Sequence, residues 1–419
     1  MRRPKGIFQK IDWWLIILFL LLVLIGWLNI YAAVYDEEHT SILDIQQRYG
    51  KQLIFILAAM LIALATLSID QKFFNSVSYI IYGTTILILV VVIFIGKEVS
   101  GSKSWIHIGG FGFQPAEFAK TATALVLARF LSSLEVDFRK PKYLIISFLL
   151  FLIPCLLVLM QHDTGSALVF FAFILVLYRA GLTGFVLLAF VIIPVLGVLA
   201  LLVPKLILAG VILLICIVLF LRTRRRIRNL LLTFLLFLAS TGFVFSVDYV
   251  FNRVLQPHQQ QRIKVLLWME TDVKGAGYNV NQSLIAIGSG RLTGKGYLQG
   301  TQTKYNFVPE QSTDFIFCTI GEEWGFIGSF IIILLFTALF VRIILIAERQ
   351  RAKFSRYFGY GLASVLFFHF AINIGMPIGL LPVICIPLPF ISYGGSSLWA
   401  FTLMLFIFIR QDSKRYELV

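Results

Sequence analysis

The sequence predicts an all-α polytopic membrane protein, a bundle of about 10–12 transmembrane helices with one large extracytoplasmic loop. Of its 419 residues, 59% are hydrophobic and only 14% are charged, whereas soluble domains are about 45–50% apolar and roughly 25% charged. Apolar runs that approach the ~20 residues needed to cross hydrocarbon recur along the chain. Because an open sheet edge cannot lie in lipid, each run is expected to be a helix.

The apolar runs that are candidates for these helices cover residues 13–35, 53–69, 77–96, 113–133, 143–161, 164–180, 182–203, 206–221, 230–250, 315–341, 357–376 and 389–409. The connection 251–314 is far longer than the others and carries most of the polar motifs. A connection this long is usually functional or disordered, and its aromatic and β-branched residues favour function. A purely structural cap is the alternative. We predict a single transmembrane domain over residues 1–419.

The Lys and Arg residues predict the orientation of the chain. The 251–314 segment is left out of this comparison, because long loops cross membranes largely regardless of charge. The remaining segments on the N-terminal side then hold several times more Lys and Arg than those on the opposite side. We therefore expect both termini in the cytoplasm and the 251–314 segment outside. The basic run at 222–228 is expected to be a topology signal rather than a lipid or nucleic-acid site.

Three ionisable residues lie within or beside apolar runs, all on the expected outer side. Glu117 and Lys120 start the fourth run, and their spacing places them on one helix face. Asp163 lies at the turn between the fifth and sixth runs. Ionisable groups at membrane depth are costly and are candidates for function. The structural alternative is that Glu117 and Lys120 only pair with each other.

The segment 373–397 is rich in Pro and Gly, which break helices. At membrane depth, broken backbone is tolerated where it is buried in protein or lines a cavity. We expect a cavity wall that includes the hydroxyls of Thr313, Ser392, Tyr393, Ser396 and Ser397. A kinked loop without a ligand is the alternative.

Polar and glycine-rich motifs extend along the whole chain. They include Gly101-Ser-Lys-Ser-Trp105, Gln114-Pro-Ala-Glu117-Phe-Ala-Lys120, Gln161-His-Asp163-Thr-Gly165, Gln261-Arg262, Asp272-Val-Lys-Gly275-Ala-Gly277, Gly300-Thr-Gln302, Pro309-Glu310-Gln-Ser-Thr313-Asp314 and the Asn373–Ser397 run. In this order they resemble the SEDS family of cell-wall polymerases, and residues 300–302 are more similar to its elongation members than to its division members. The sequence departs from the family pattern where Val273 follows Asp272 and where Ser104 replaces an Arg. Family members have ten spans, which implies an extra helix pair within 182–250.

The resemblance implies a peptidoglycan glycosyltransferase that polymerises lipid II into glycan strands during cell elongation. It would act at the outer face of the bacterial cytoplasmic (inner) membrane. Asp272 matches the essential aspartate of the family and would be the general base that takes the proton of the attacking sugar hydroxyl. From its local sequence alone, without the resemblance, a loop-surface or Asx-turn aspartate beside glycine is the favoured explanation of Asp272.

The leaving pyrophosphate needs cations to hold its charge. The candidate substrate- and pyrophosphate-binding residues are Arg262, Lys295, Lys120, Trp105, Gln282 and Ser396. A divalent cation, Mg²⁺ or Mn²⁺, is expected, with Glu117 and Asp163 as metal or charge partners. The roles of Glu310, Thr313 and Asp314 stay open, because helix capping explains Asp314 as well.

The resemblance also implies partners, namely a class B penicillin-binding protein transpeptidase and other membrane proteins of the elongation complex. No nucleic acid is expected. Two other functions remain as alternatives, a lipid II flippase or transporter and a non-catalytic scaffold of the elongation machinery. Transporters also have broken spans, but their charged residues lie near the membrane midplane. The position of the charges at the outer edge favours the enzyme.

Overall fold

The structure, a computed structural model, places helices at all the predicted apolar runs. It describes residues 11–35, 44–99, 101–108, 111–133, 136–138, 140–222, 227–255, 260–261, 263–264, 267, 276–305 and 307–415. The predicted class, a polytopic helical membrane protein, is confirmed.

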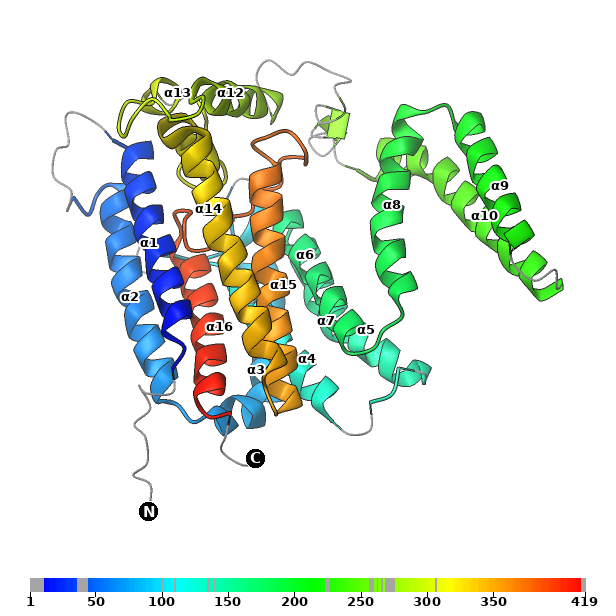
Figure 1. Ribbon diagram of the computed structural model, residues 1–419, viewed down its shortest axis with the longest axis horizontal. Helices are drawn as coiled ribbons and strands as arrows, with labels where there is room; N and C mark the ends of the chain where they lie inside the picture. Colours follow the sequence, from blue (N-terminus) through cyan, green and yellow to red (C-terminus); the bar gives the residue numbers. More distant parts are fainter. Residues whose placement is uncertain are drawn as a thin grey trace. The chain divides into compact units, whose positions relative to one another are not determined.

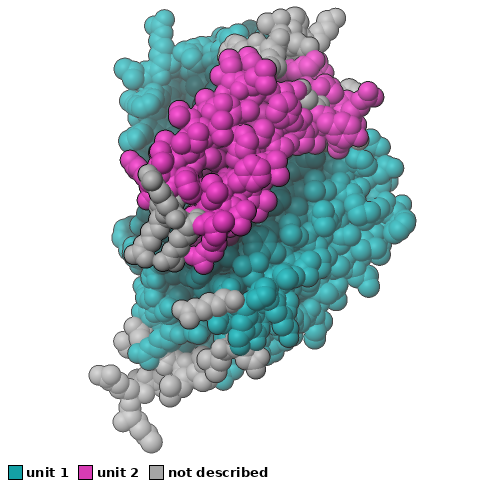
Figure 2. Space-filling view, turned by 90° about the vertical axis from the view of Figure 1, so that its right-hand side faces the viewer, with its two compact units in different colours: residues 1–182, 278–419 teal, residues 183–277 magenta. Residues whose placement is uncertain are grey.

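The described chain forms two compact units, which Figure 2 colours separately. The larger unit comprises residues 1–182 and 278–419, and the smaller comprises 183–277. The smaller unit contains α8 (Gly184–Leu202), α9 (Lys205–Arg222), α10 (Ile227–Tyr249) and the π-helical η3 (Val250–Val254). The helices of the larger unit are α1 (Trp13–Ala33), α2 (Arg48–Ser68), α3 (Gln71–Ile95), α4 (Pro115–Ser132), α5 (Pro141–Met160), α6 (Thr164–Val169), the 3₁₀ helix η2 (Phe170–Ala172), α7 (Phe173–Arg179), α12 (Ala276–Ser289), α13 (Thr301–Lys304), α14 (Ile316–Glu348), α15 (Lys353–Gly375) and α16 (Gly395–Ser413).

In the described part of the chain, nine helices are long and apolar enough to cross a membrane. They are α1, α2, α3, α5, α8, α9, α10 continued by η3, α14 and α15. The other predicted runs correspond to α4, α16 and the short pair α6 and α7. Protein, rather than lipid, surrounds most residues of α4 and α16. Their sequences therefore tolerate charged and polar side chains that a lipid-facing helix would not.

Helix α4 lies in the interior of the larger unit, packed against α3, α5, α15 and α16. Alanines recur along it, and almost all of its residues are buried. Small side chains let neighbouring helices approach closely. This central position explains why the charged side chains of α4 are enclosed by protein.

A three-stranded antiparallel sheet between α3 and α4 was not predicted. It consists of β1 (Lys97–Val99), β2 (Ser102–Ile108) and β3 (Phe111–Phe113), in the order β1-β2-β3. Lys97 pairs with Trp105, and His107 pairs with Gly112. The apolar runs form helices as expected, but this sheet lies in the connection between two of them. An open sheet edge is unfavourable only where it faces lipid, so a sheet can form in this connection.

Helix α14 is broken at Gly325, which has φ 66° and ψ −159°. The break frees backbone groups of the helix, and the segment 291–296 binds them. The amides of Lys295 and Gly296 donate to the carbonyls of residues 322 and 323, at 3.0 and 3.1 Å. The amides of residues 326 and 327 donate back to residues 291 and 292, at 2.9 and 3.0 Å. The segment and the helix are thus joined backbone to backbone.

This joint requires glycine at position 294, and we expect Gly294→Ala to destabilise the protein. Gly294 has φ 82°, and a Cβ there would lie 2.0 Å from the carbonyl oxygen of Glu323. Gly101→Ala is the matched control, because Gly101 has φ 84° with nothing within 4 Å of an added Cβ. The control should lose about 1–2 kcal/mol through backbone strain, and Gly294→Ala about 1–3 kcal/mol more through the clash. Thermal unfolding of the full chain measures both, and equal losses would contradict the close approach.

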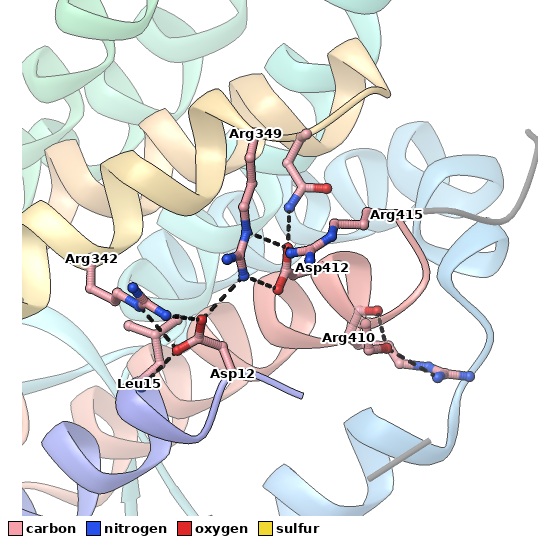
Figure 3. Close-up of polar contacts among 9 residues, drawn as sticks. Asp12, Leu15, Arg342, Arg349, Arg410, Asp412 and Arg415 are labelled. Atoms are coloured by element: carbon pink, nitrogen blue, oxygen red, sulfur yellow. Dashed lines mark hydrogen bonds and ion pairs between the residues drawn. The ribbon is translucent and has the colours of Figure 1, made fainter. Parts of the chain in front are cut away.

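Charged residues join α1, α14 and α16 at the end of the bundle where the described chain begins and ends (Figure 3). Asp12, the N-cap of α1, accepts hydrogen bonds from Arg342 at 3.1 and 2.6 Å and from Arg349 at 3.1 Å. Arg349 also donates to Asp412, at 3.1 and 2.5 Å. The start of α1 and the end of α16 therefore lie at the same end of the larger unit.

This network predicts a stability that depends on pH. Burial alone would raise the pKa of Asp12, but the hydrogen bond and charge of Arg342, the helix cap and Arg349 hold it below the usual 3.8. The stabilisation is therefore present above pH 3.8 and is lost as the pH falls through the lower, folded-state pKa.

Asp12→Asn separates the charge of this residue from its role as a helix cap. Asn caps helices as well as Asp does, so the variant should lose only the ion pairs. We expect a loss of about 1–2 kcal/mol at neutral pH, a modest value because the arginines are partly exposed. Thermal unfolding at neutral and acidic pH measures it. The difference in stability between the variant and the wild type should shrink as the pH falls. A variant as stable as the wild type at neutral pH would contradict the role of the network.

Candidate functional site

The polar segments of the larger unit gather at the end of its helices opposite the termini. At this end, α12 and α13 lie over the start of α14 (Figure 1). The sheet and the first turns of α4, α6 and α16 lie at the same end. This end holds all the predicted site residues of the larger unit that the structure describes.

Gln114 connects the first turns of α4, α6 and α16. Its side-chain amide donates to Asp163 at 2.7 Å, and its backbone amide donates to the Ser396 hydroxyl at 3.1 Å. Asp163 also caps α6 by accepting from the Ser166 amide at 2.9 Å. The structure thus brings together two predicted site residues, Asp163 and Ser396, through Gln114, which was part of a motif but was not predicted as a site residue. Both carboxylate oxygens of Asp163 accept hydrogen bonds in this arrangement.

Glu117 and Lys120 pair with each other inside the protein. Their N–O distance is 2.6 Å, and the side chains are 2% and 1% exposed. Lys120 Nζ also lies 2.8 Å from His369 Nε2 and 5.6 Å from the centre of the Phe401 ring. The pairing predicted as the structural alternative is therefore present, with a histidine added to it. His369 was missed because nothing in the sequence marks a single histidine in an apolar helix as the neighbour of a residue so far along the chain.

Lys295 is held by a buried carboxylate. Its ammonium lies 2.7 Å from Glu322, whose side chain is fully buried. Glu322 also accepts from the backbone amides of Gln302 and Thr303, each at 2.9 Å, at the start of α13. The carboxylate satisfies free amides of this helix, as an N-terminal acidic group does. In this structure, Lys295 and Glu322 fix α13 and the 291–296 segment onto α14.

The segment before α14 is fixed from two directions. Arg48 donates to Glu310 at 3.1 Å and to Ser312 at 2.7 Å, and the Arg48–Glu310 pair is exposed. Asn373 on α15 donates to the carbonyl of Asp314 at 2.9 Å. Arg48 was also missed, because the first turn of α2 shows no motif.

Several of the hydroxyls expected to line a cavity bind backbone groups, and the cavity itself stays a prediction. Ser392 donates to the carbonyl of Thr313 at 2.6 Å and accepts from the amide of Leu388 at 2.9 Å. Ser397 donates to the carbonyl of Gly394 at 3.3 Å. In the 373–397 segment, these hydroxyls satisfy backbone groups that Pro and Gly leave without helical partners.

Trp105 and Gln282 lie on different elements of this end. Trp105 is half-buried on β2, where its ring covers Gly112 of β3. Gln282 is half-buried on α12, and the neighbouring Ser283 anchors that helix by donating to the carbonyl of Pro377 at 2.8 Å. The predicted catalytic residue Asp272 and the predicted cation Arg262 lie outside the described residues, so their roles stay predictions.

The expected divalent cation stays a prediction, because Asp272 lies outside the described residues. No three His, Cys, Asp or Glu side chains among them are grouped so that they could hold a metal ion. Glu117, predicted as a metal partner, is paired with Lys120, and Asp163 is bound to Gln114 and to the start of α6. Donors thus occupy one carboxylate oxygen of Glu117 and both carboxylate oxygens of Asp163 in this structure.

The chain matches a family model described as "Cell cycle protein", that of FtsW, RodA and SpoVE, over residues 12–210 and 184–417. It is 33% identical to the peptidoglycan glycosyltransferase RodA of Treponema pallidum, over 95% of this chain and 96% of that protein. It is also 33% identical to the peptidoglycan glycosyltransferase MrdB of Escherichia coli K12, over 90% of this chain and 88% of that protein.

Solved structures have the same fold. One, described as a peptidoglycan synthase complex that coordinates polymerization and crosslinking, contains a chain with a TM-score of 0.69 and 24% identity, covering 97% of this chain and 99% of that chain. Another is an aspartate-to-alanine mutant of the rod shape determining protein RodA of Thermus thermophilus, with a TM-score of 0.63, 23% identity and the same coverage. The family model and the relatives span nearly the whole sequence, and the chain therefore belongs to the SEDS family, which includes FtsW, RodA and SpoVE.

Proposed function

We propose that the protein is a peptidoglycan glycosyltransferase of cell elongation that polymerises lipid II at the outer face of the bacterial cytoplasmic membrane. The observation that carries this proposal is the full-length similarity to RodA and MrdB, both named peptidoglycan glycosyltransferases. The clustering of the described polar motifs at one end of the bundle supports it, because a lipid-linked sugar reaches the protein at a membrane surface.

In the proposed reaction, Asp272 acts as the general base. The hydroxyl oxygen of the acceptor sugar attacks the anomeric carbon of the donor, and Asp272 takes the hydroxyl proton. The bond between that carbon and the pyrophosphate oxygen breaks, and pyrophosphate leaves on its lipid carrier. Arg262 is the first candidate to hold the leaving charge, because the ammonium groups of Lys120 and Lys295 are already paired with buried carboxylates.

We also propose that both termini are cytoplasmic. Their shared end of the bundle is consistent with the excess of Lys and Arg on that side, and it places the polar end outside. The chain leaves the larger unit after α7 at the termini end, where Arg179 donates to Glu348 and to Tyr360. It returns with α12 at the opposite end. A single membrane crossing would be enough to connect these two ends of the larger unit. The chain between them has three helices of spanning length, α8–α10, so two of them are additional and support the extra pair.

A class B penicillin-binding protein transpeptidase is the partner that we propose, together with other membrane proteins of the elongation complex. The support is the similarity to a chain of the peptidoglycan synthase complex that couples polymerization with crosslinking. Newly made glycan must be crosslinked, so a polymerase and a transpeptidase act on the same strand in succession.

The test is a polymerisation assay with purified full-length protein and fluorescent lipid II in proteoliposomes. The wild type should produce glycan chains, and Asp272→Ala should produce none. Lipid II movement across the bilayer with no polymer would refute the enzyme and favour the flippase. If Asp272→Ala still maintained rod shape in cells, the result would favour the scaffold and contradict the catalytic role.

A further inference from the structure

His369 makes a polar contact at each end of its ring. On one side, Nδ1 lies 3.1 Å from the carbonyl oxygen of Pro387. On the other side, Nε2 lies 2.8 Å from Nζ of Lys120. The ring is 1% exposed and meets the Phe401 ring edge-on at 4.8 Å. Its orientation is therefore set by two hydrogen bonds and by packing.

The chemistry of the two contacts determines the tautomer of His369. A carbonyl oxygen only accepts hydrogen bonds, so Nδ1 must carry a proton to bind Pro387. An ammonium only donates, so Nε2 must be the unprotonated nitrogen that accepts from Lys120. Only the neutral ring with its proton on Nδ1 satisfies both neighbours. A second proton on Nε2 would place two donors against each other.

The ion pair that His369 supports is not fully satisfied. Oε1 of Glu117 binds Lys120, but the buried Oε2 has no hydrogen-bond partner within the described part of the chain. A lysine side chain is flexible, and one carboxylate oxygen would leave its ammonium free to reorient. The second contact, from His369, fixes the ammonium on the helix face that also carries Glu117.

The other contact of His369 reaches the polar end of the bundle. Pro387 belongs to the 373–397 segment, where Ser392 binds the carbonyl of Thr313 just before α14. Asn373, one helical turn after His369, binds the carbonyl of Ile386 at 2.7 Å. His369 thus connects the charged pair of α4 with the segment that encloses the candidate site.

We propose that His369 is a positioning residue, whose neutral imidazole holds the Lys120 ammonium in the place that glycan polymerisation requires. This inference rests on the proposed function. It assigns no contact with substrate to His369, which acts through Lys120. The competing explanation is that His369 only fixes α15 to the 373–397 segment through Pro387.

Two conservative variants separate these explanations. In His369→Gln, the side-chain oxygen can take the place of Nε2 and accept from Lys120. In His369→Asn, the amide nitrogen can take the place of Nδ1 and donate to Pro387, but the acceptor for Lys120 is lost. We expect His369→Asn to lower kcat about 10- to 100-fold with a much smaller change in KM for lipid II. His369→Gln should retain most of the wild-type kcat.

The same measurements in a Lys120→Met background complete the test. If His369 acts through Lys120, His369→Asn should lower kcat no further in that background, because the two changes remove one interaction. A larger loss in His369→Gln than in His369→Asn would overturn the proposal and support the structural tether. Equal losses in both variants, or a full additional loss in the Lys120→Met background, would also overturn it.

Histidine-selective nitrogen-15 NMR gives a readout that does not depend on activity. The sequence contains five histidines, and the resonances missing from the His369→Gln spectrum identify this one. We expect a neutral ring with its proton on Nδ1 at neutral pH, and a shifted Nε2 resonance in Lys120→Met. An unchanged resonance would overturn the contact. If the wild type made no glycan, the proposed function would fail, while this spectrum would still decide whether His369 holds Lys120.

Discussion

Asp272→Asn is expected to lower the rate of glycan polymerisation by about 10²–10⁴-fold, the usual contribution of a general base. Asparagine has nearly the same shape as aspartate but cannot take a proton from the attacking hydroxyl. Binding of lipid II should change much less, because the lost interaction belongs to the transition state. Single-turnover assays with fluorescent lipid II measure the chemical step directly.

Glu98→Gln is a matched control for the loss of one carboxylate. Glu98 is an exposed residue of β1, outside the candidate site but at the same end of the bundle. This variant should polymerise lipid II at the wild-type rate. If Asp272→Asn polymerised lipid II as fast as Glu98→Gln, Asp272 would not be the base. The base would then be another carboxylate of the 251–314 segment.

Lys120→Met is expected to destabilise the protein by about 3–5 kcal/mol, because it leaves the carboxylate of Glu117 buried without its cation. The two side chains are almost completely enclosed and lie 2.6 Å apart. Methionine keeps much of the length and apolar volume of lysine, so the packing of α4 should change little. Thermal unfolding of the purified protein in detergent measures the loss.

The double variant Glu117→Gln/Lys120→Met tests whether the lone charge causes this loss. Removing both charges should restore most of the stability, because replacing a buried ion pair by neutral groups is often nearly neutral. A double variant as unstable as Lys120→Met would mean that packing, rather than charge, determines the effect. The same variant should still polymerise lipid II more slowly than the wild type, because the Lys120 ammonium is absent.

The helices could be predicted from the sequence because lipid requires a continuous apolar surface along each span. The C-terminal end of α14 could not be predicted from the sequence. The helix continues past the expected boundary at 341 and ends at Glu348. Its last turns are stabilised by partners distant in the sequence, such as Asp12 for Arg342. The sheet at 97–113 was missed for a related reason, since strands outside the membrane leave no long apolar signal.

The candidate site was predictable where its contacts are local. The spacing of Glu117 and Lys120 alone indicated a shared helix face, and the structure confirms their contact. The contacts of His369 with Lys120 and of Gln114 with Asp163 join different helices, so they could not be predicted from the helical spacing of residues in the sequence. Lys295 was predicted as a cation for substrate, and its contact with Glu322 could not be predicted because the two residues lie on different segments.

The break in α14 has a consequence for how the protein enters the membrane. Backbone groups without partners cost several kcal/mol in hydrocarbon, and a helix interrupted at Gly325 exposes four of them during insertion. The residues that bind these groups, 291–296, precede α14 in the chain. The ribosome therefore synthesises residues 291–296 before α14. When α14 enters the membrane, its free backbone groups can bind this segment at once.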